Sequence, residues 1–92
     1  MLTPKMKRRI KNKLRTEKPT VHVGKEGVTA QIVQEIRKQL DAREMIKSKI
    51  LKTALQEKEA KAIAIKISEQ TESELIEVRG HTFILFKRKK RQ

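Results

Sequence analysis

A chain of 92 residues with no cysteine has room for one small domain, and it offers neither disulfides nor a thiolate metal site. Its formal charge of +13 points to a polyanionic partner, and no apolar run approaches the roughly 18 residues that a membrane span requires. The basic N-terminal region lacks the apolar stretch of a secretory signal, so we expect a cytoplasmic protein, with an organellar transit peptide as the alternative.

The positive charge is concentrated at the two ends of the chain. Residues 5–18 carry eight Lys or Arg and one Glu, and residues 87–91 form the unbroken run KRKKR. Residues 19–86 hold eleven basic and ten acidic side chains, so the middle of the chain is almost neutral. Separate positive ends predict binding to nucleic acid or to an anionic membrane, with a solubilising surface and a frayed tail as the alternative.

The first predicted element is a basic helix that begins near Pro4. Thr3 is suited to cap it, and proline suits a first turn, in which a backbone N–H has no partner. Met6, Ile10 and Leu14 recur every four residues as a narrow apolar stripe. The other faces carry cationic side chains, namely Lys5, Lys7, Arg8, Arg9, Lys11, Lys13 and Arg15. We therefore expect this helix to dock by its stripe and to present a dense positive surface.

A short strand, a loop with two glycines and a second helix are predicted after Pro19. The segment TVHV, residues 20–23, is rich in branched residues, which is typical of a strand. The loop at 24–27 has the pattern G-x-x-G, and Thr29 is suited to cap the helix that follows. That helix has apolar residues at helical spacing, namely Ile32, Val33, Ile36 and Leu40.

The second half of the chain is predicted to hold a strand, a helix and a β-hairpin. In MIKSKIL, residues 45–51, Lys47 and Lys49 alternate with the inward residues, and we expect both lysines to be ordinary exposed strand residues. Residues 53–70 fit both a helix and a strand, but their length and their lack of Gly and Pro favour a helix. ELIEV and TFILF are two strands joined at RGH, where Gly80 is free to adopt a positive φ. The order α-β-α-β-α-β-β predicts an α/β (α+β) domain with a mixed sheet, with parallel crossovers first and a hairpin last.

The sequence contains no recognisable catalytic constellation. Asp41 is the sole aspartate, the ten glutamates are scattered, and neither His22 nor His81 has a metal-ligand spacing around it. Nucleotide-binding loops and nucleophile elbows are also absent from the sequence. We therefore expect no enzyme activity, no metal and no cofactor.

The loop Gly24-Lys25-Glu26-Gly27 lies where a predicted strand meets a predicted helix. The start of a helix presents unpaired N–H groups and the positive end of its dipole, and glycines allow a sugar–phosphate backbone to come close to them. In KH domains a GXXG loop clamps about four nucleotides in this way. Alone the motif indicates a plain turn, but beside a strongly basic helix it predicts a contact with nucleic acid.

Three separated motifs occur in the order and spacing of one family: VHVGKEGVT at 21–29, EMIKSKI at 44–50 and VRGHTFILFKR at 78–88. On these motifs the chain resembles the CRM domain (chloroplast RNA splicing and ribosome maturation), specifically its stand-alone prokaryotic YhbY-like members. The resemblance implies a single RNA-binding domain at 1–88, followed by a basic C-terminal tail at 89–92. It also implies a four-stranded sheet and a fold similar to the C-terminal domain of initiation factor three.

The resemblance further implies a ribosome-assembly factor that binds the ribosomal RNA of the large-subunit precursor. A cofactor for the splicing or folding of another structured RNA is the alternative. Two residues depart from the expected pattern. Glu26 places a negative charge in the loop, where phosphate would be repelled, and Ser48 replaces a residue that is usually apolar, which suggests a less demanding core position.

The predicted RNA-binding residues lie in three segments. By the resemblance, the loop contacts RNA through Gly24, Lys25, Glu26 and Gly27. The first helix contributes Lys5, Lys7, Arg8, Lys11 and Arg15, and the C-terminal end contributes Lys87, Arg88, Lys89, Lys90 and Arg91. Among these we rank Arg8, Lys11 and Arg15 first, since we expect them to lie opposite the apolar stripe of the first helix.

The predicted mode of binding relies on the RNA backbone and its shape. Phe83 and Phe86 are the only aromatic residues, and both lie in a strand that is predicted to be buried. Bases therefore have no aromatic side chain on which to stack. The high charge favours a monomer. A double-stranded DNA-binding protein is the alternative from another class, although no helix-turn-helix is evident, and a membrane-surface protein would lack an aromatic anchor.

Overall fold

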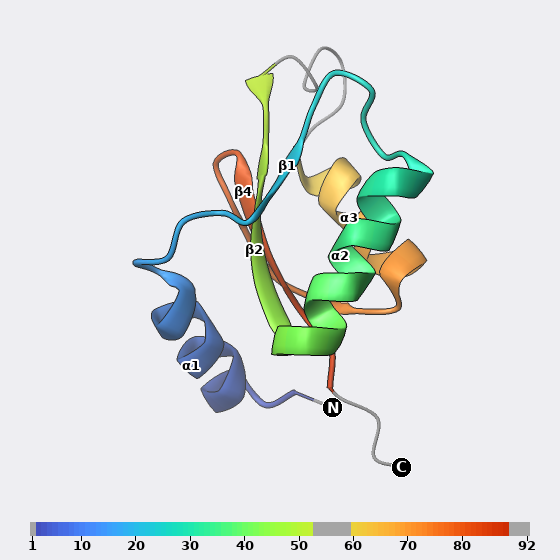
Figure 1. The fold of residues 1–92 in the computed structure, drawn as a ribbon. Coiled ribbons are helices and arrows are strands. Elements are labelled where there is room, and N and C mark those ends of the chain that lie inside the picture. The colour runs from blue at the N-terminus through green and yellow to red at the C-terminus, as the bar shows by residue number, and fades with distance from the viewer. Residues whose placement is uncertain (1, 53–59, 89–92) are drawn as a thin grey trace.

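The helices and strands follow one another in the predicted order. The computed structural model of the protein describes residues 2–52 and 60–88. Its elements are α1 (Pro4–Leu14), β1 (Val21–Val23), α2 (Ala30–Arg43), β2 (Met45–Ile50), α3 (Ala60–Thr71), β3 (Glu74–Arg79) and β4 (Thr82–Phe86) (Figure 1). The predicted fold class is confirmed. The predicted tail at 89–92 and the first part of the predicted third helix, residues 53–59, lie outside the described residues.

The described strands form one mixed sheet in the order β1-β2-β4-β3. β1 pairs with β2 in parallel, and β4 lies antiparallel between β2 and β3. Strands β1, β2 and β3 therefore run in one direction, which confirms the predicted crossovers, and β3 and β4 form the predicted hairpin. Gly80 closes this hairpin with a φ of +59°, a conformation that side chains with a Cβ rarely adopt.

Helices cover both faces of the sheet (Figure 1). α2 and α3 pack on one face, over the main core, whose fully buried members include Ile36, Ile46, Ile67, Phe83 and Leu85. α1 packs on the other face through a smaller cluster of Ile10, Leu14, Ile76 and Ile84. No helix within residues 2–52 and 60–88 combines the length and the apolar character needed to cross a bilayer.

Local signals in the sequence account for the helix boundaries. The Thr3 hydroxyl accepts a hydrogen bond from the Met6 N–H at 3.1 Å, and the Thr29 hydroxyl accepts one from Ile32 at the same distance. Both predicted caps are therefore confirmed. In α3, Ile65 is 40% exposed although its neighbours Ile63 and Ile67 belong to the core. The predicted helix is therefore confirmed for residues 60–70, the part of this ambiguous segment that the structure describes.

A β-bulge in β3 turns two consecutive residues toward α1. The register shifts between Leu75 and Glu77. As a result Ile76 joins the small cluster beneath α1, and the carboxylate of the next residue, Glu77, lies 3.8 Å from the ammonium of Lys11. Bulges commonly re-aim a side chain in this manner.

Ser48 is not a less demanding core position, and that interpretation was wrong. The residue is fully buried in β2, and its hydroxyl donates a hydrogen bond of 2.8 Å to the Val21 carbonyl of β1. A buried hydroxyl needs such a partner, because an unpaired one costs about 1–3 kcal/mol. The serine is therefore accommodated as a tightly packed core residue, with its hydroxyl paired across β1 and β2.

Candidate nucleic-acid interface

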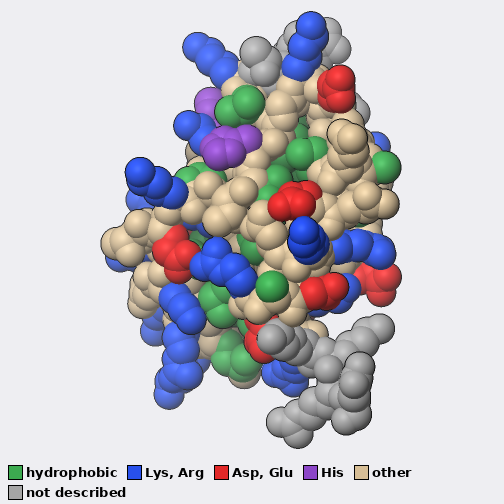
Figure 2. Space-filling view, in the orientation of Figure 1, with side chains coloured by type: hydrophobic (Ala, Val, Ile, Leu, Met, Phe, Trp, Pro, Cys, Tyr) green, Lys and Arg blue, Asp and Glu red, His purple; other side chains and the backbone are tan. Residues whose placement is uncertain are grey.

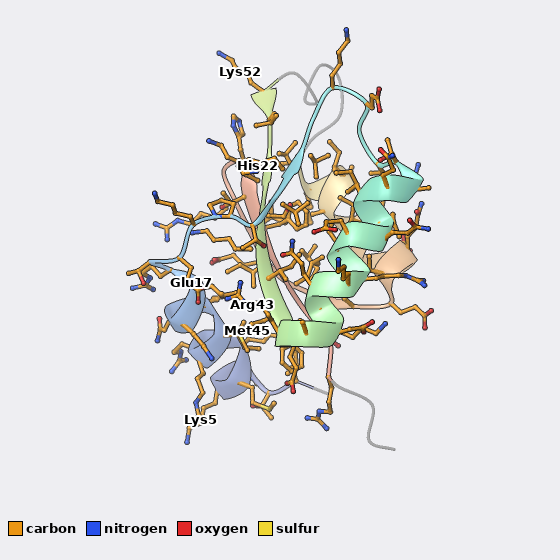
Figure 3. All side chains as sticks on the ribbon, viewed as in Figure 1. Lys5, Glu17, His22, Arg43, Met45 and Lys52 are labelled. Carbon is orange, nitrogen blue, oxygen red and sulfur yellow. The ribbon has the colours of Figure 1, made fainter. Side chains whose placement is uncertain are left out.

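α1 presents a positive surface without a balancing acidic residue on the helix. It docks through Ile10 and Leu14, which are 5% and 1% exposed, while its other faces carry six Lys or Arg, and Arg15 follows as the C-cap. Lys5, at the N-terminal end of α1, projects into solvent (Figure 3). In the space-filling view, Lys and Arg side chains project along the side of the molecule that α1 occupies (Figure 2). This charge distribution suits a polyanion.

The expectation that Lys11 and Arg15 lie opposite the apolar stripe is wrong. Each residue directly follows a docked residue, and one step along a helix turns by only about 100°. Both side chains therefore lie on a flank of α1 rather than opposite its stripe, and both line a small pocket, although Arg15 is exposed. Arg8 is exposed, in agreement with its predicted place.

Lys47 is also not an ordinary exposed residue, contrary to the prediction. It is half-buried on β2, and its ammonium donates hydrogen bonds to carbonyl oxygens at the C-terminal end of α1. The acceptors are the carbonyls of Leu14 and Arg15, both at 3.5 Å, and of Glu17 at 3.2 Å. Leu14 and Arg15 end the helix and Glu17 follows it, and a cation is favourable at this end of the helix dipole. Lys47 thus fixes α1 on the sheet, whereas Lys49 is exposed as predicted.

The segment after α1 is tied to α2 by an ion pair. The Arg43 guanidinium donates to the Glu17 carboxylate at 2.7 Å, and the two residues meet between the end of α1 and the end of α2 (Figure 3). Both side chains are partly exposed, so the pair contributes little to stability by itself. Together with Lys47, it limits where α1 can lie.

The loop with two glycines forms a tight turn at the end of β1. The Gly27 N–H donates to the Gly24 carbonyl at 2.9 Å, which leaves Lys25 and Glu26 exposed at the tip. Gly27 has a φ of +72°, so the turn itself favours glycine there. Gly24 has no such constraint, and a Cβ at this position would meet only the Leu51 side chain at 3.7 Å, an ordinary contact. The fold therefore explains Gly27 but leaves Gly24 unexplained.

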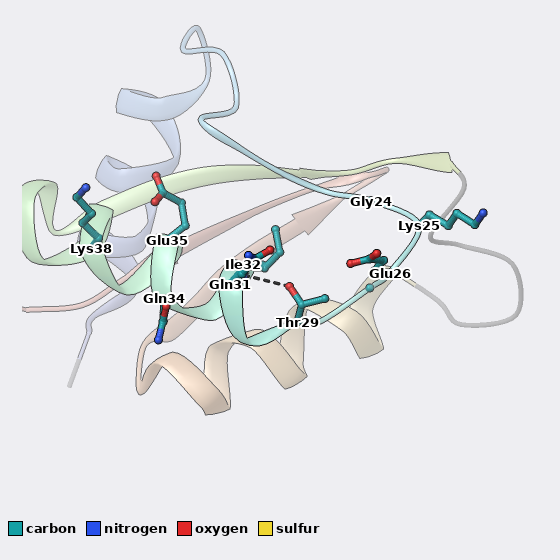
Figure 4. A pocket seen from close by; sticks show the side chains of 10 residues that line it. Gly24, Lys25, Glu26, Thr29, Gln31, Ile32, Gln34, Glu35 and Lys38 are labelled. Atoms are coloured by element: carbon teal, nitrogen blue, oxygen red, sulfur yellow. Dashed lines mark hydrogen bonds between the residues drawn. The ribbon is translucent and has the colours of Figure 1, made fainter.

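A groove of about 780 Å³ runs from this loop along the first turns of α2. Polar side chains of the helix line it at spacings of three and four residues, namely Gln31, Gln34, Glu35 and Lys38. The Lys25 side chain extends away from α2, whereas that of Glu26 points back toward it (Figure 4). The groove thus contains two lysines and two glutamates, so its charge is balanced, unlike the surface of α1. The sequence analysis did not identify this groove, although the polar face of the second helix was a usable signal.

The basic residues near the C-terminus differ from one another in their surroundings. Lys87 is half-buried, and its ammonium donates to the Thr71 carbonyl at 3.2 Å, at the C-terminal end of α3. The Arg37 guanidinium donates to the neighbouring Gln70 carbonyl at 2.8 Å. Arg88 is exposed, and Lys89, Lys90 and Arg91 lie outside the described residues.

The structure does not bring all predicted residues into one patch. The loop lies at one end of β1, while α1 lies on the opposite side of the sheet from α2 and toward the other end of the molecule (Figure 1). Lys87 and Arg88 follow β4, away from the loop (Figure 1). Within the described part of the chain, no group of three His, Asp or Glu side chains could hold a metal ion.

Known proteins resemble this chain along nearly its whole length. Residues 2–87 match the CRS1 / YhbY (CRM) domain. The chain is 38% identical over 86 residues to "Probable RNA-binding protein MJ0652" of Methanocaldococcus jannaschii, a match that covers 94% of this chain but 63% of that relative. It is 33% identical over 90 residues to "Probable RNA-binding protein YqeI" of Bacillus subtilis, covering 98% of this chain and 92% of the relative.

A solved structure has the same fold. It is the solution structure of the hypothetical protein SAV1595 from Staphylococcus aureus, which aligns with a TM-score of 0.78 at 31% sequence identity. The alignment covers 99% of this chain and 93% of the other. The arrangement of helices and sheet is therefore shared along the whole length of the domain.

Proposed function

This chain belongs to the CRS1 / YhbY (CRM) domain family, and from that premise we propose that it is an RNA-binding protein. The observation that carries the proposal is the surface of α1, which displays cationic side chains and no carboxylate of its own. The names of two relatives, both called probable RNA-binding proteins, support the same conclusion. We assign the first contacts to the sugar–phosphate backbone, because such contacts dominate affinity for nucleic acids.

Base stacking plays little part in this proposal. Phe83 is 1% exposed in the core, and Phe86 is half-buried beside the cluster beneath α1. Neither ring is free to receive a base, and the chain has no Tyr or Trp. Recognition then rests on the shape of a folded RNA, which supplies the geometry that fixes where the phosphates lie.

The loop at 24–27 is the second proposed contact. Lys25 at its tip supplies a positive charge, and α2 begins at Ala30, three residues after the loop. Glu26 points back toward the groove rather than outward with Lys25, which lessens its repulsion of phosphate at the tip (Figure 4). The remaining proposed contacts are the basic residues at the C-terminal end of the chain. Arg88 to Arg91 serve as a diffuse anchor, whereas Lys87 already holds a carbonyl of α3.

Alanine substitutions at the two loop glycines are expected to separate binding from stability. Gly27→Ala forces a Cβ into a positive φ and should lower the free energy of unfolding by about 1–2 kcal/mol. Gly24→Ala meets no such strain and should leave stability within about 0.5 kcal/mol of the wild type. If RNA approaches the backbone at Gly24, this second variant nevertheless binds RNA several-fold more weakly. Urea unfolding and fluorescence anisotropy with a labelled RNA stem–loop measure the two effects, and equal RNA affinity for Gly24→Ala and wild type would remove the loop from the interface.

We propose further that the RNA is ribosomal RNA of the large-subunit precursor and that the protein is an assembly factor that acts as a cytoplasmic monomer. The motifs that resemble stand-alone YhbY-like proteins support this target. So does a binding surface that depends on RNA shape, because ribosomal RNA is extensively folded. A monomer is consistent with a high positive charge, which disfavours self-association.

Crosslinking in the cells that make the protein tests this target. We expect crosslinks to precursor ribosomal RNA of the large subunit through Lys25 and through the cationic residues of α1. Reads dominated by introns or transfer RNA would keep the RNA-binding function but replace the assembly role with that of a splicing or folding cofactor. Recovery of DNA in place of RNA would overturn the proposed function.

A further inference from the structure

A small pocket lies between α1 and the sheet, apart from the loop at 24–27. Its volume is about 80 Å³, which is room for several water molecules and hence for one phosphate group. The polar side chains that line it are Lys11, Arg15, Lys47, Arg79, Glu77 and Thr82. Four cations thus face one carboxylate and one hydroxyl. Such a lining favours an anion. The Thr82 hydroxyl already donates to the Arg79 carbonyl at 2.9 Å, so the attraction comes from the cations.

Lys47 removes the main electrostatic objection to an anion at this place. The pocket lies at the C-terminal end of α1, where the helix dipole and the carbonyl oxygens in and just after the last turn would repel a phosphate. The ammonium of Lys47 lies 3.2–3.5 Å from three of these oxygens and donates to them. The negative end of the helix is therefore neutralised from within the fold, which leaves Arg15 and Arg79 free to face a ligand.

The pairing of the strands places a row of polar side chains across the sheet, beginning at the pocket. His22 pairs with Lys49, Lys49 with Thr82, and Thr82 with Arg79. Side chains alternate along a strand, and Val21, Val23 and Phe83 point into the main core, so this row lies on the face that α1 covers in part. His22, Lys49 and Arg79 are exposed. With about 4.8 Å between neighbouring strands, the row spans the width of the sheet from the pocket to the edge strand β1.

We propose that this pocket binds one phosphate of the RNA backbone. From there the RNA strand runs along the row of side chains from Thr82 to His22. The proposal rests on the RNA-binding function proposed above and adds to it a contact surface on the sheet, between α1 and β1. Arg79 and Arg15 bind the phosphate, and Lys49 contacts the next part of the backbone. Lys47 acts as a positioning residue, since its donors are engaged by α1. Glu77, which pairs with Lys11, lowers the affinity of the site.

Substitutions that remove one charge test the site, because removing a cation and removing a carboxylate should change RNA affinity in opposite directions. With a labelled RNA stem–loop, Arg79→Gln is expected to weaken binding roughly threefold to fivefold and to lower the slope of log K against log salt by about 0.7–0.9. Glu77→Gln removes the opposing charge and is expected to strengthen binding about threefold, a gain that partial unfolding could not produce. Lys66→Gln, on exposed α3 surface behind the other face of the sheet, is the matched control and should change neither quantity.

Inorganic phosphate provides the second arm of the test. In NMR spectra of the wild-type protein, added phosphate should shift the amide signals of residues 79–82 and 11–15, and Arg79→Gln should abolish these shifts. If RNA binds but Arg79→Gln and Glu77→Gln both behave as the wild type, the pocket is refuted and the RNA-binding function stands. If phosphate shifts these amides but no RNA binds, the site holds a free phosphate compound, and both the RNA-binding function and this path for the strand are wrong.

Discussion

The affinity of this protein for RNA is expected to fall by roughly two to four orders of magnitude when the salt concentration is raised fourfold. If about five to eight phosphates are neutralised, log K falls against log salt with a slope of about 0.7–0.9 per contact. The cations of α1, Lys25 and the sheet residues Lys49 and Arg79 supply that number of contacts without any tail residue. Fluorescence anisotropy with one RNA stem–loop at several salt concentrations gives the slope directly.

A triple variant of α1 tests how much of this salt dependence comes from the helix. Arg8→Gln, Lys11→Gln and Arg15→Gln together should reduce the slope by about two to three, if each residue contacts one phosphate. Glutamine keeps much of the side-chain length and the helix propensity, so the fold should be retained. A wild-type slope near zero would contradict a phosphate-dominated interface, and an unchanged slope in the triple variant would move that interface away from α1.

Replacing Leu14 by alanine is expected to lower the free energy of unfolding by about 2–5 kcal/mol. Leu14 is 1% exposed, and it is one of four buried residues in the cluster that holds α1 on the sheet. The cost comes from lost apolar burial and from a cavity that the small cluster cannot easily refill. Urea unfolding followed by circular dichroism measures the change. Leu51→Ala is the matched control, because Leu51 is 38% exposed, and it should cost less than about 1 kcal/mol.

The same substitution is expected to weaken RNA binding even where the variant remains folded. A loosened α1 no longer holds Lys11 and Arg15 beside Arg79. The three cations then have no fixed relative position, and their contacts with one RNA no longer support one another. Binding should therefore be measured well below the unfolding midpoint of the variant. Wild-type affinity in folded Leu14→Ala would show that RNA does not depend on how α1 is docked.

Features set by neighbouring residues could be predicted from the sequence. Thr3 and Thr29 cap their helices through residues three positions away, and both caps follow from local pattern alone. The apolar spacing of residues 60–67 also identified α3 correctly, because its buried and exposed positions repeat with the helical period. The order of elements then limited the sheet to a few arrangements, and the observed one is among them.

Features that depend on contacts between distant segments could not be predicted. From the sequence, Lys47 is a lysine on the outer face of a strand. Its hydrogen bonds to the carbonyls of Leu14 and Glu17 exist only because α1 lies over that face. The row from His22 to Arg79 likewise requires the register of all the described strands. Glu77 faces Lys11 because of a bulge that no local pattern indicated.

The position of β4 in the sheet also bears on how the protein is made. Although β4 is the last element along the chain, it lies between β2 and β3, and its side chains serve both cores: Phe83 and Leu85 on one face, Ile84 on the other. A nascent chain that has not yet reached residue 86 can form helices, but it lacks the strand that joins β2 to β3. We therefore expect α1 to dock only after β4 has been inserted between β2 and β3. We thus expect the two cores of this domain to form together, in one cooperative step.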